Sequence, residues 1–311
     1  MADSPPHEFE VPPGATVLDL IRTGAVAFER AGLCYGHGMA NAIDEAAALV
    51  FHALDLEHTA GAAAYRLRPE AADVERVLRL LASRVERRVP AAYLMGRMWF
   101  ADLEFEVDER VIVPRSPFAE LIMAGFEPWL RAGEIRRVLD IGTGSACIAI
   151  ACAKYLEGVT VDAVELSPAA LEVARHNVAK HAVGGRVRLL QGDVYGPVAD
   201  QRYDLIVANP PYVSDSEMSE LPAEYRHEPD LALRSGIDGL DVTRRILAGA
   251  AQHLENGGAL FVEVGDSEER LQQAFPTVPF LWLEFEHGGG GVFMLTREDL
   301  ARHRHAFCSQ A

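Results

Sequence analysis

The residues best suited to chemistry are Asn209-Pro210-Pro211-Tyr212, which directly follow the apolar run Leu205–Ala208. An amide nitrogen is a poor nucleophile because its lone pair is delocalised, so it must be oriented before it reacts. The Asn209 side-chain oxygen and the Pro210 carbonyl can each accept one of its N–H bonds. The prolines fix the backbone without a competing donor, and Tyr212 can exclude water from a flat group. We therefore expect all four residues to be catalytic through positioning, without a strong general base.

A second motif, Asp140-Ile141-Gly142-Thr143-Gly144, lies between an apolar run that begins at Val138 and an apolar segment of helical length. Glycines there let the backbone approach a ligand, and the start of the following helix offers unpaired N–H groups. A ligand is therefore expected at the C-terminal edge of this strand. The loop alone would also fit a dinucleotide site or a simple tight turn.

Two acidic residues narrow the choice of ligand. Glu165 ends the next apolar run, about 20 residues on, where a carboxylate can accept both ribose hydroxyl protons. Asp193 follows the third run and can accept from an adenine amino group. Either one alone could be a helix cap or a loop acid. Together with the motif at Asn209 they favour S-adenosyl-L-methionine over a nicotinamide cofactor. The expected cofactor-binding residues are Asp140, Gly142, Thr143, Gly144, Glu165, Asp193 and Asn209.

The motifs stand at the ends of short β-branched runs separated by helix-length segments. This pattern is typical of βαβ units and predicts an α/β fold with a mostly parallel, seven-stranded sheet. The last two runs alternate and are joined through the glycine-rich stretch 287–291, so the sheet should finish with antiparallel strands. The predicted strands are Val138–Ile141, Val159–Val164, Val187–Leu190, Leu205–Ala208, Ala259–Val264, Phe280–Phe285 and Val292–Leu295.

The first part of the chain has a different pattern. Apolar residues recur at three- and four-residue steps from about Leu18 to Val89, which predicts a small N-terminal helical domain. An alternating stretch around Trp99–Val107 then predicts a β-hairpin or connector. The predicted organisation is a helical substrate-recognition domain at 1–96, a β-hairpin connector at 97–118 and a methyltransferase catalytic domain at 119–311.

Bulk properties restrict the function classes. A hydrophobic content of 49% without a membrane-length apolar run, and a start that lacks signal-peptide features, predict a soluble, cytoplasmic protein with no membrane partner. The net charge of −17 opposes broad phosphate-backbone binding and suits a basic protein partner better. The four cysteines have neither paired nor CxxC spacing, so we expect free thiols and no metal site. They are Cys34, Cys147, Cys152 and Cys308.

With these motifs identified, the chain resembles the protein glutamine N(5)-methyltransferases over nearly its whole length. Members of that family act on bacterial release factors or on a large-subunit ribosomal protein. Both branches share the glycine loop, the motif at Asn209, and the segments Glu228–Leu233 and Gly236–Leu240. The resemblance implies a Rossmann-like class I S-adenosylmethionine-dependent methyltransferase fold. It also implies that the chain methylates the side-chain amide nitrogen of a glutamine.

Three segments resemble the branch that acts on ribosomal protein uL3. The release-factor branch typically reads Pro-Arg-Pro-Glu-Thr-Glu where this chain has Pro114–Ala119. The resemblance therefore implies uL3, free or in an assembling large subunit, as the partner, a role in ribosome biogenesis, and no sequence-specific DNA binding. The three segments are Tyr35–Gly38 with Asn41–Ala46, Val113–Ile122, and Leu221–Pro229.

Two positions depart from the family's usual residues. Ala146 stands where glycine is usual, but dinucleotide loops tolerate alanine at the equivalent place, so cofactor binding should survive. Glu165 replaces the commoner aspartate, which should shift the ribose contact without removing it.

Three alternative functions stay open. They are the release-factor branch, a non-catalytic assembly factor, and an adenine-N6 methyltransferase. The last would need base flipping and a basic reading surface.

Charged clusters elsewhere permit two interpretations each. The arginines between Arg76 and Arg88 could guide an acidic or RNA-bearing partner, but a solvated helix face is the commoner meaning of such a run. Arg115 and Glu120 could order a ligand or pair with each other. The tail Arg302–Cys308 fits no closed metal site and is expected to be disordered.

Overall fold

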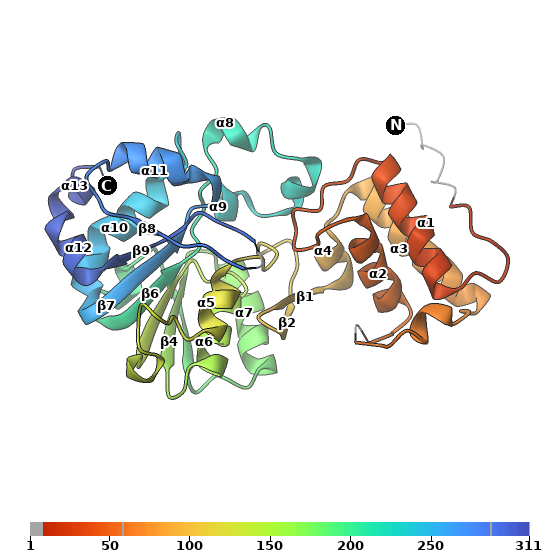
Figure 1. The fold of residues 1–311 in the computed structure, drawn as a ribbon, viewed down its shortest axis with the longest axis horizontal. Helices are drawn as coiled ribbons and strands as arrows, with labels where there is room; N and C mark the ends of the chain where they lie inside the picture. The colour runs from red at the N-terminus through yellow and green to blue at the C-terminus, as the bar shows by residue number, and fades with distance from the viewer. Residues whose placement is uncertain (1–8, 58, 287, 311) are drawn as a thin grey trace. The chain divides into compact units, whose positions relative to one another are not determined.

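The computed structural model describes residues 9–57, 59–286 and 288–310. Residues 1–8, whose sequence argued against a signal peptide, lie outside these ranges, as does His287 of the expected hairpin loop. The chain divides into two compact units (Figure 1). The helical unit contains the described residues up to Met98 together with Pro222–His227, and the sheet unit contains Trp99–Leu221 and the described residues from Glu228 onward. The domain limits of the sequence analysis stay predictions, and they had placed Pro222–His227 within the domain at 119–311.

The helical unit confirms the expected N-terminal helices. Thr16 caps the first of them in a capping box with Asp19, in which each side chain bonds the other's backbone N–H. Asn41 caps the second by accepting two backbone N–H bonds. Apolar side chains from the helices, including the fully buried Leu20 and Leu81, form a common core. The elements are α1 (Val17–Arg30), α2 (Ala42–Ala53), η1 (Ala64–Arg66), α3 (Ala71–Arg87), α4 (Ala91–Met95) and η4 (Ala223–His227).

The described part of the sheet unit has one seven-stranded sheet, in the order β5-β4-β3-β6-β7-β9-β8. Strands β3 to β7 pair in parallel, whereas β9 pairs antiparallel with both β7 and β8. This confirms the expected α/β fold and its antiparallel finish. The strands are β3 (Arg137–Ile141), β4 (Thr160–Glu165), β5 (Val187–Gln191), β6 (Tyr203–Ala208), β7 (Leu254–Glu263), β8 (Leu281–Trp282) and β9 (Val292–Thr296). Earlier in the chain, β1 (Arg97–Phe100) pairs with β2 (Leu103–Glu106), where a hairpin was expected.

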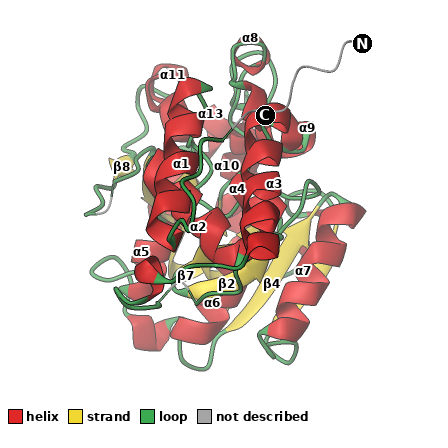
Figure 2. Ribbon diagram, turned by 90° about the vertical axis from the view of Figure 1, so that its right-hand side faces the viewer, coloured by secondary structure: helices red, strands yellow, loops and turns green. Residues whose placement is uncertain are grey.

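Helices pack against this sheet. The contacts join α6 to β3 and β4, α7 to β4 and β5, and α10 and α12 to β7, and Figure 2 shows α7 alongside β4. Leu139 and Ile141 of β3 share a core with α10, so Asp140 between them faces the opposite side of the sheet. The helices are α5 (Phe118–Met123), α6 (Cys147–Tyr155), α7 (Pro168–Lys180), α8 (Asp215–Met218), α9 (Asp230–Leu233), α10 (Asp241–His253), α11 (Glu268–Ala274), α12 (Arg297–Arg302) and α13 (Arg304–Cys308). Short 3-10 turns lie at η2 (Ala132–Glu134), η3 (Gly196–Val198) and η5 (Gly265–Ser267).

The C-terminal tail corrects one expectation. The prediction of a disordered Arg302–Cys308 is wrong, because these residues end α12 and form α13. Phe307 is fully buried, and its ring lies 5.3 Å from that of Phe275 in an edge-to-face arrangement. The apolar contact holds the tail against the core. Within the ranges that the structure describes, none of the helices has the length and apolar character needed to span a bilayer.

Candidate functional site

A cavity of about 240 Å³ lies at the C-terminal ends of β3, β4 and β6 in the sheet unit. Parallel strands end at one edge of a sheet, which is why motifs far apart in the sequence meet there. Most of the residues singled out in the sequence share this cavity. They are Gly142, Gly144, Glu165, Asp193, Asn209 and Pro211.

The glycine loop has a left-handed backbone at three alternate positions. Gly142 has φ +74° and Gly144 has φ +54°, and Ala146 takes the same region with φ +65°. A side chain disfavours this conformation, so glycine is the natural residue at all three. Ala146 then directly precedes Cys147, the first residue of α6. The alanine therefore occupies a position whose backbone favours the glycine usual in the family.

Asp140 and Thr143 lie behind the loop and do not line the cavity. Both are buried, and the Thr143 hydroxyl donates to Asp140 Oδ2 over 2.5 Å. Burial raises the pKa of Asp140 to about 7, although the hydrogen bonds from Thr143 and from the Ala149 backbone oppose the shift. The pair therefore supports the turn of the loop from the α6 side of the sheet. Their expected part in cofactor binding stays a prediction.

Glu165 stands at the cavity wall and is held there by the backbone. Its Oε2 accepts from the Gly144 N–H over 2.9 Å, and its Oε1 accepts from the Ser167 N–H over 2.8 Å. Each carboxylate oxygen can accept more than one hydrogen bond, so both retain capacity toward the cavity. The Ser167 side chain in turn caps α7. Glu165 is thus an oriented acceptor of the kind that a ribose needs.

Asp193 forms an ion pair with Arg245 of α10, and both residues line the cavity. The two side chains are each about half exposed, at 49% and 44%. Asp193 can still accept a hydrogen bond from an amino group, because each of its oxygens has two lone pairs. Sequence reasoning missed Arg245, which lies within an ordinary amphipathic helix and has no motif around it.

The residues Asn209-Pro210-Pro211-Tyr212 lie between two spaces. Asn209 and Pro211 line the cavity described above, whereas Tyr212 lines a groove of about 1410 Å³ together with Glu263. A small hollow of about 20 Å³, bordered by Asn209, Pro210 and Tyr212, adjoins them. The motif therefore borders both the cavity and the open groove.

Glycines elsewhere make room for this motif. A Cβ added to Gly265 would lie 2.7 Å from the Tyr212 ring, and one added to Gly239 would lie 2.3 Å from the Tyr212 carbonyl oxygen. The same carbonyl accepts from the Ser267 hydroxyl over 3.0 Å. The place of Tyr212 thus depends on backbone approaches that only glycine permits.

Comparison with known proteins identifies the family. A family model described as methyltransferase small domain matches residues 124–224. A relative from Xanthomonas campestris pv. campestris, named ribosomal protein uL3 glutamine methyltransferase, is 50% identical over 93% of each chain. Relatives with the same name from Xylella fastidiosa and Francisella tularensis are 48% and 39% identical, and the alignments cover 93% and 94% of this chain and 92% and 93% of theirs.

The chain belongs to this family of uL3 glutamine methyltransferases. The segments that pointed to it in the sequence lie at structured places. Arg115 forms a two-pronged ion pair with Glu228, with N–O distances of 2.5 and 2.7 Å, and the Val113 N–H donates to the same carboxylate. This pair joins the segment before α5 to the one before α9. Glu120 accepts instead from the Glu286 backbone N–H.

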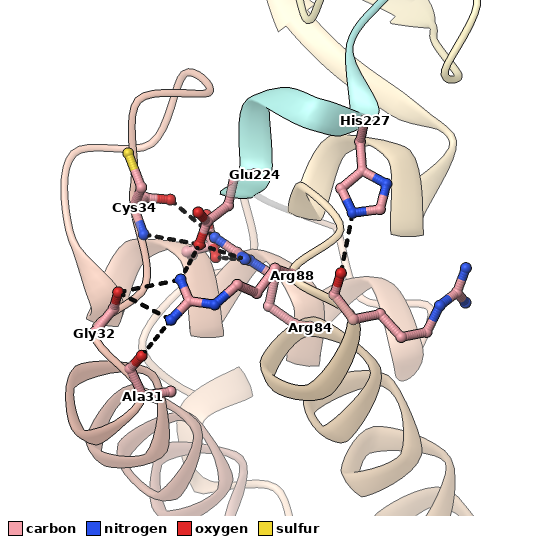
Figure 3. Close-up of polar contacts among 9 residues, drawn as sticks. Ala31, Gly32, Cys34, Arg84, Arg88, Glu224 and His227 are labelled. Carbon is pink, nitrogen blue, oxygen red and sulfur yellow. Dashed lines mark hydrogen bonds and ion pairs between the residues drawn. The ribbon is translucent and has the colours of Figure 1, made fainter. Parts of the chain in front are cut away.

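Two further family segments meet inside the helical unit, where Glu224 lies fully buried (Figure 3). Its Oε1 accepts from the Cys34 N–H over 3.0 Å and forms ion pairs with Arg84 and Arg88. The Tyr225 ring lies 4.5 Å from that of His37. The segments around Tyr35 and Pro222 therefore form one packed structure.

Arg84 fits neither interpretation of the arginines between Arg76 and Arg88. Its side chain is 0% exposed, so it neither guides a partner nor belongs to a solvated helix face. Its Nε donates to Glu45 over 2.6 Å. Its Nη2 donates to the Cys34 carbonyl over 2.9 Å, a contact drawn in Figure 3. Buried charges persist only when they are paired and hydrogen-bonded, and this network supplies both conditions. By contrast, Arg79 is 65% exposed and pairs with Glu75 on the outer face of α3.

Proposed function

We propose that the chain transfers a methyl group from S-adenosyl-L-methionine to the side-chain amide nitrogen of a glutamine in ribosomal protein uL3. The observation that carries the proposal is the place of Asn209-Pro210-Pro211-Tyr212 between the cavity and the groove. A methyl donor in the cavity and a polypeptide in the groove would meet at these residues. The names and the high identity of the relatives support the choice of uL3.

The cavity residues fit this cofactor. Glu165 presents oriented carboxylate oxygens to a ribose, and Asp193 can accept from an adenine amino group. Leu231 is apolar but 53% exposed, and its position in the cavity wall would let a flat purine ring cover it. When bound, the cofactor supplies an electrophilic methyl group. Gly142 and Gly144 leave room for it because they carry no side chain.

The residues of the motif at Asn209 would then orient the amide. Asn209 Oδ1 and the Pro210 carbonyl accept its two N–H bonds, which directs the nitrogen lone pair toward the cavity. Tyr212 packs against the flat group and keeps water away from it. The amide nitrogen would take the methyl group as the donor's sulfur–methyl bond breaks and its electron pair stays on sulfur. The two acceptors would stabilise the positive charge on nitrogen until one N–H proton is released to bulk solvent. The proposed catalysis is positioning combined with hydrogen-bond acceptance.

The groove also suits a basic polypeptide. Its lining carries the acidic residues Asp102, Glu120, Asp266, Glu268 and Glu269, and the whole chain has a net charge of −17. Negative potential of this kind attracts and orients a positively charged partner and disfavours nucleic acid. A cytoplasmic location, where ribosomal proteins are made and assembled, is part of the proposal.

A labelling experiment with competing substrates tests the proposal. Purified chain and methyl-labelled cofactor are incubated with uL3, a release factor or duplex DNA in parallel, at equal concentrations. We expect label in uL3 only, located on one glutamine by tandem mass spectrometry. Label in the release factor alone would assign the chain to the other branch. Label in DNA would support the adenine alternative, and the absence of label in all three would favour a non-catalytic assembly role.

A further inference from the structure

Glu263 lies directly beside the catalytic asparagine. Strands β6 and β7 are parallel, and Ala208 is in register with Val262. Asn209 and Glu263 are the next residues on the two strands, so they stand side by side at the edge that carries the site. Glu263 is only 5% exposed, yet it borders the groove together with Tyr212. A buried carboxylate is therefore placed next to the motif at Asn209.

The hydrogen bonds of Glu263 are directional. Its Oε2 accepts from the Ser116 hydroxyl over 2.6 Å. The Ser116 oxygen itself accepts from the Phe118 backbone N–H over 3.2 Å, which leaves the hydroxyl proton for the carboxylate. The side chain of Asn209, at the end of the neighbouring strand, also lowers the pKa of Glu263 and so favours its charged form. The carboxylate therefore stands between a hydroxyl donor and the Asn209 amide.

This arrangement determines which end of the Asn209 amide faces Glu263 and which end faces the cavity that Asn209 lines. An ionised carboxylate only accepts hydrogen bonds, so it holds the NH₂ end of Asn209 and leaves Oδ1 directed away from it. The proposed reaction requires that orientation, because Oδ1 must accept from the substrate amide. In the reversed orientation the Asn209 NH₂ group would face the substrate amide NH₂ group, and two donors cannot form a hydrogen bond with each other. Glu263 therefore selects one of the two orientations of the Asn209 amide, which Asn209 alone would not do.

We propose that Glu263, held by Ser116, is a positioning residue that locks the Asn209 amide with its oxygen toward the substrate nitrogen. The inference rests on the proposed function and names a residue for it that no sequence motif had indicated. Ser116 gains a role too, as the donor that fixes the carboxylate. Neither residue needs to touch the reacting atoms.

The orientation should depend on pH. Burial raises the pKa of Glu263 to about 7, although Ser116, the nearby Arg115 charge and Asn209 lower it in part. Asp266, on the segment after β7, and Tyr212 border the same groove. Because the ionised carboxylate is the form that holds Asn209, activity should rise as pH increases through about 7. Protonated Glu263 can donate, which removes the preference for one amide orientation.

Two substitutions at Glu263 separate positioning from structural support. Glu263→Leu removes every acceptor, so kcat should fall by about 10- to 100-fold while the KM for the cofactor stays unchanged. Glu263→Gln cannot ionise and, like protonated Glu263, offers a donor as well as an acceptor, so it should keep the low-pH activity of wild type at every pH and lose the rise with pH. Asp140 also has a pKa of about 7. It is present in every variant, so its effect on the pH profile cancels when each variant is compared with wild type.

Two further variants complete the set. Ser116→Ala removes a hydrogen bond that favours the charged form, so the midpoint of the pH rise should move to higher pH. Glu134→Gln removes an exposed carboxylate that pairs only locally with Arg131, and it should match wild type throughout. Thermal unfolding of each variant checks that the fold is retained.

A measurement without substrate keeps the two proposals apart. The Asn209 side-chain NH₂ signals, followed by nitrogen NMR, should shift with a midpoint near pH 7 in wild type and not in Glu263→Gln. A wild-type chain that methylates no glutamine but shows this titration would overturn the proposed function alone. Wild-type kcat in folded Glu263→Leu, or an unchanged pH rise in Glu263→Gln, would overturn the positioning role alone.

Discussion

Two buried carboxylates of the helical unit and two at the edge of the sheet have different partners. Glu45 and Glu224 of the helical unit contact the Arg84 guanidinium. Asp140 and Glu263 of the sheet unit accept instead from the hydroxyls of Thr143 and Ser116. The pKa values of the last two are raised to about 7 by burial. Burial also raises the pKa of Glu45, but the Arg84 charge opposes that shift, whereas the two hydroxyl-bonded carboxylates titrate near neutral pH, as functional sites often require.

Removing the shared arginine should have the largest effect on stability. Arg84→Met leaves Glu45 buried without its cation, and removing one partner of a buried pair costs about 3–5 kcal/mol. Urea denaturation should show that loss in the free energy of unfolding. Arg79→Met is the matched control on the same helix, because its exposed pair with Glu75 contributes less than about 1 kcal/mol. Equal losses in the two variants would remove the distinction between scaffold and surface pairs.

The raised pKa of Asp140 should make the sheet unit less stable as pH rises toward neutral. The pKa of Asp140 is raised from 3.8 to about 7, so the stability it contributes is complete below pH 3.8 and is lost as pH rises through about 7. Asp140→Asn should therefore reduce the loss of unfolding free energy between pH 5 and pH 8. Denaturation at the two pH values measures this difference. An identical pH dependence in wild type and variant would contradict the assignment.

The smallest expected effect concerns the cofactor loop. Ala146→Gly relieves a left-handed backbone and should raise the free energy of unfolding by about 1 kcal/mol. Ala149→Gly, within the regular part of α6, is the control and should lower it by at least about 0.5 kcal/mol. Thermal unfolding of both variants provides the comparison. A loss of stability in Ala146→Gly would show that the surroundings have adapted to the alanine.

The parts of the fold that follow local rules could be predicted from the sequence. The strands and the glycine loop were recognisable because their patterns lie within a few residues. Arg84 was misinterpreted although a signal was present, since it lies seven residues after Val77 and therefore on the apolar stripe of α3. A charged residue on such a stripe indicates a buried partner.

Other site residues had weaker signals or none. Glu263 lies at the end of the predicted strand Ala259–Val264, and a carboxylate at the C-terminal end of a buried strand was the available clue. Arg245 reaches the cavity only because α10 packs beside β7. Glu224 enters the helical unit through a segment that the chain contributes long after α3. Contacts between distant parts of a sequence depend on topology, which local patterns do not encode.

The most direct test of the central claim is tandem mass spectrometry of uL3 after incubation with cofactor and either wild type or Asn209→Ala. We expect one additional methyl group on a single glutamine with wild type. We also expect a rate lower by about 100- to 1000-fold with the variant, while thermal unfolding stays unchanged. Methylation at any residue other than glutamine, or an undiminished rate in the folded variant, would contradict this claim.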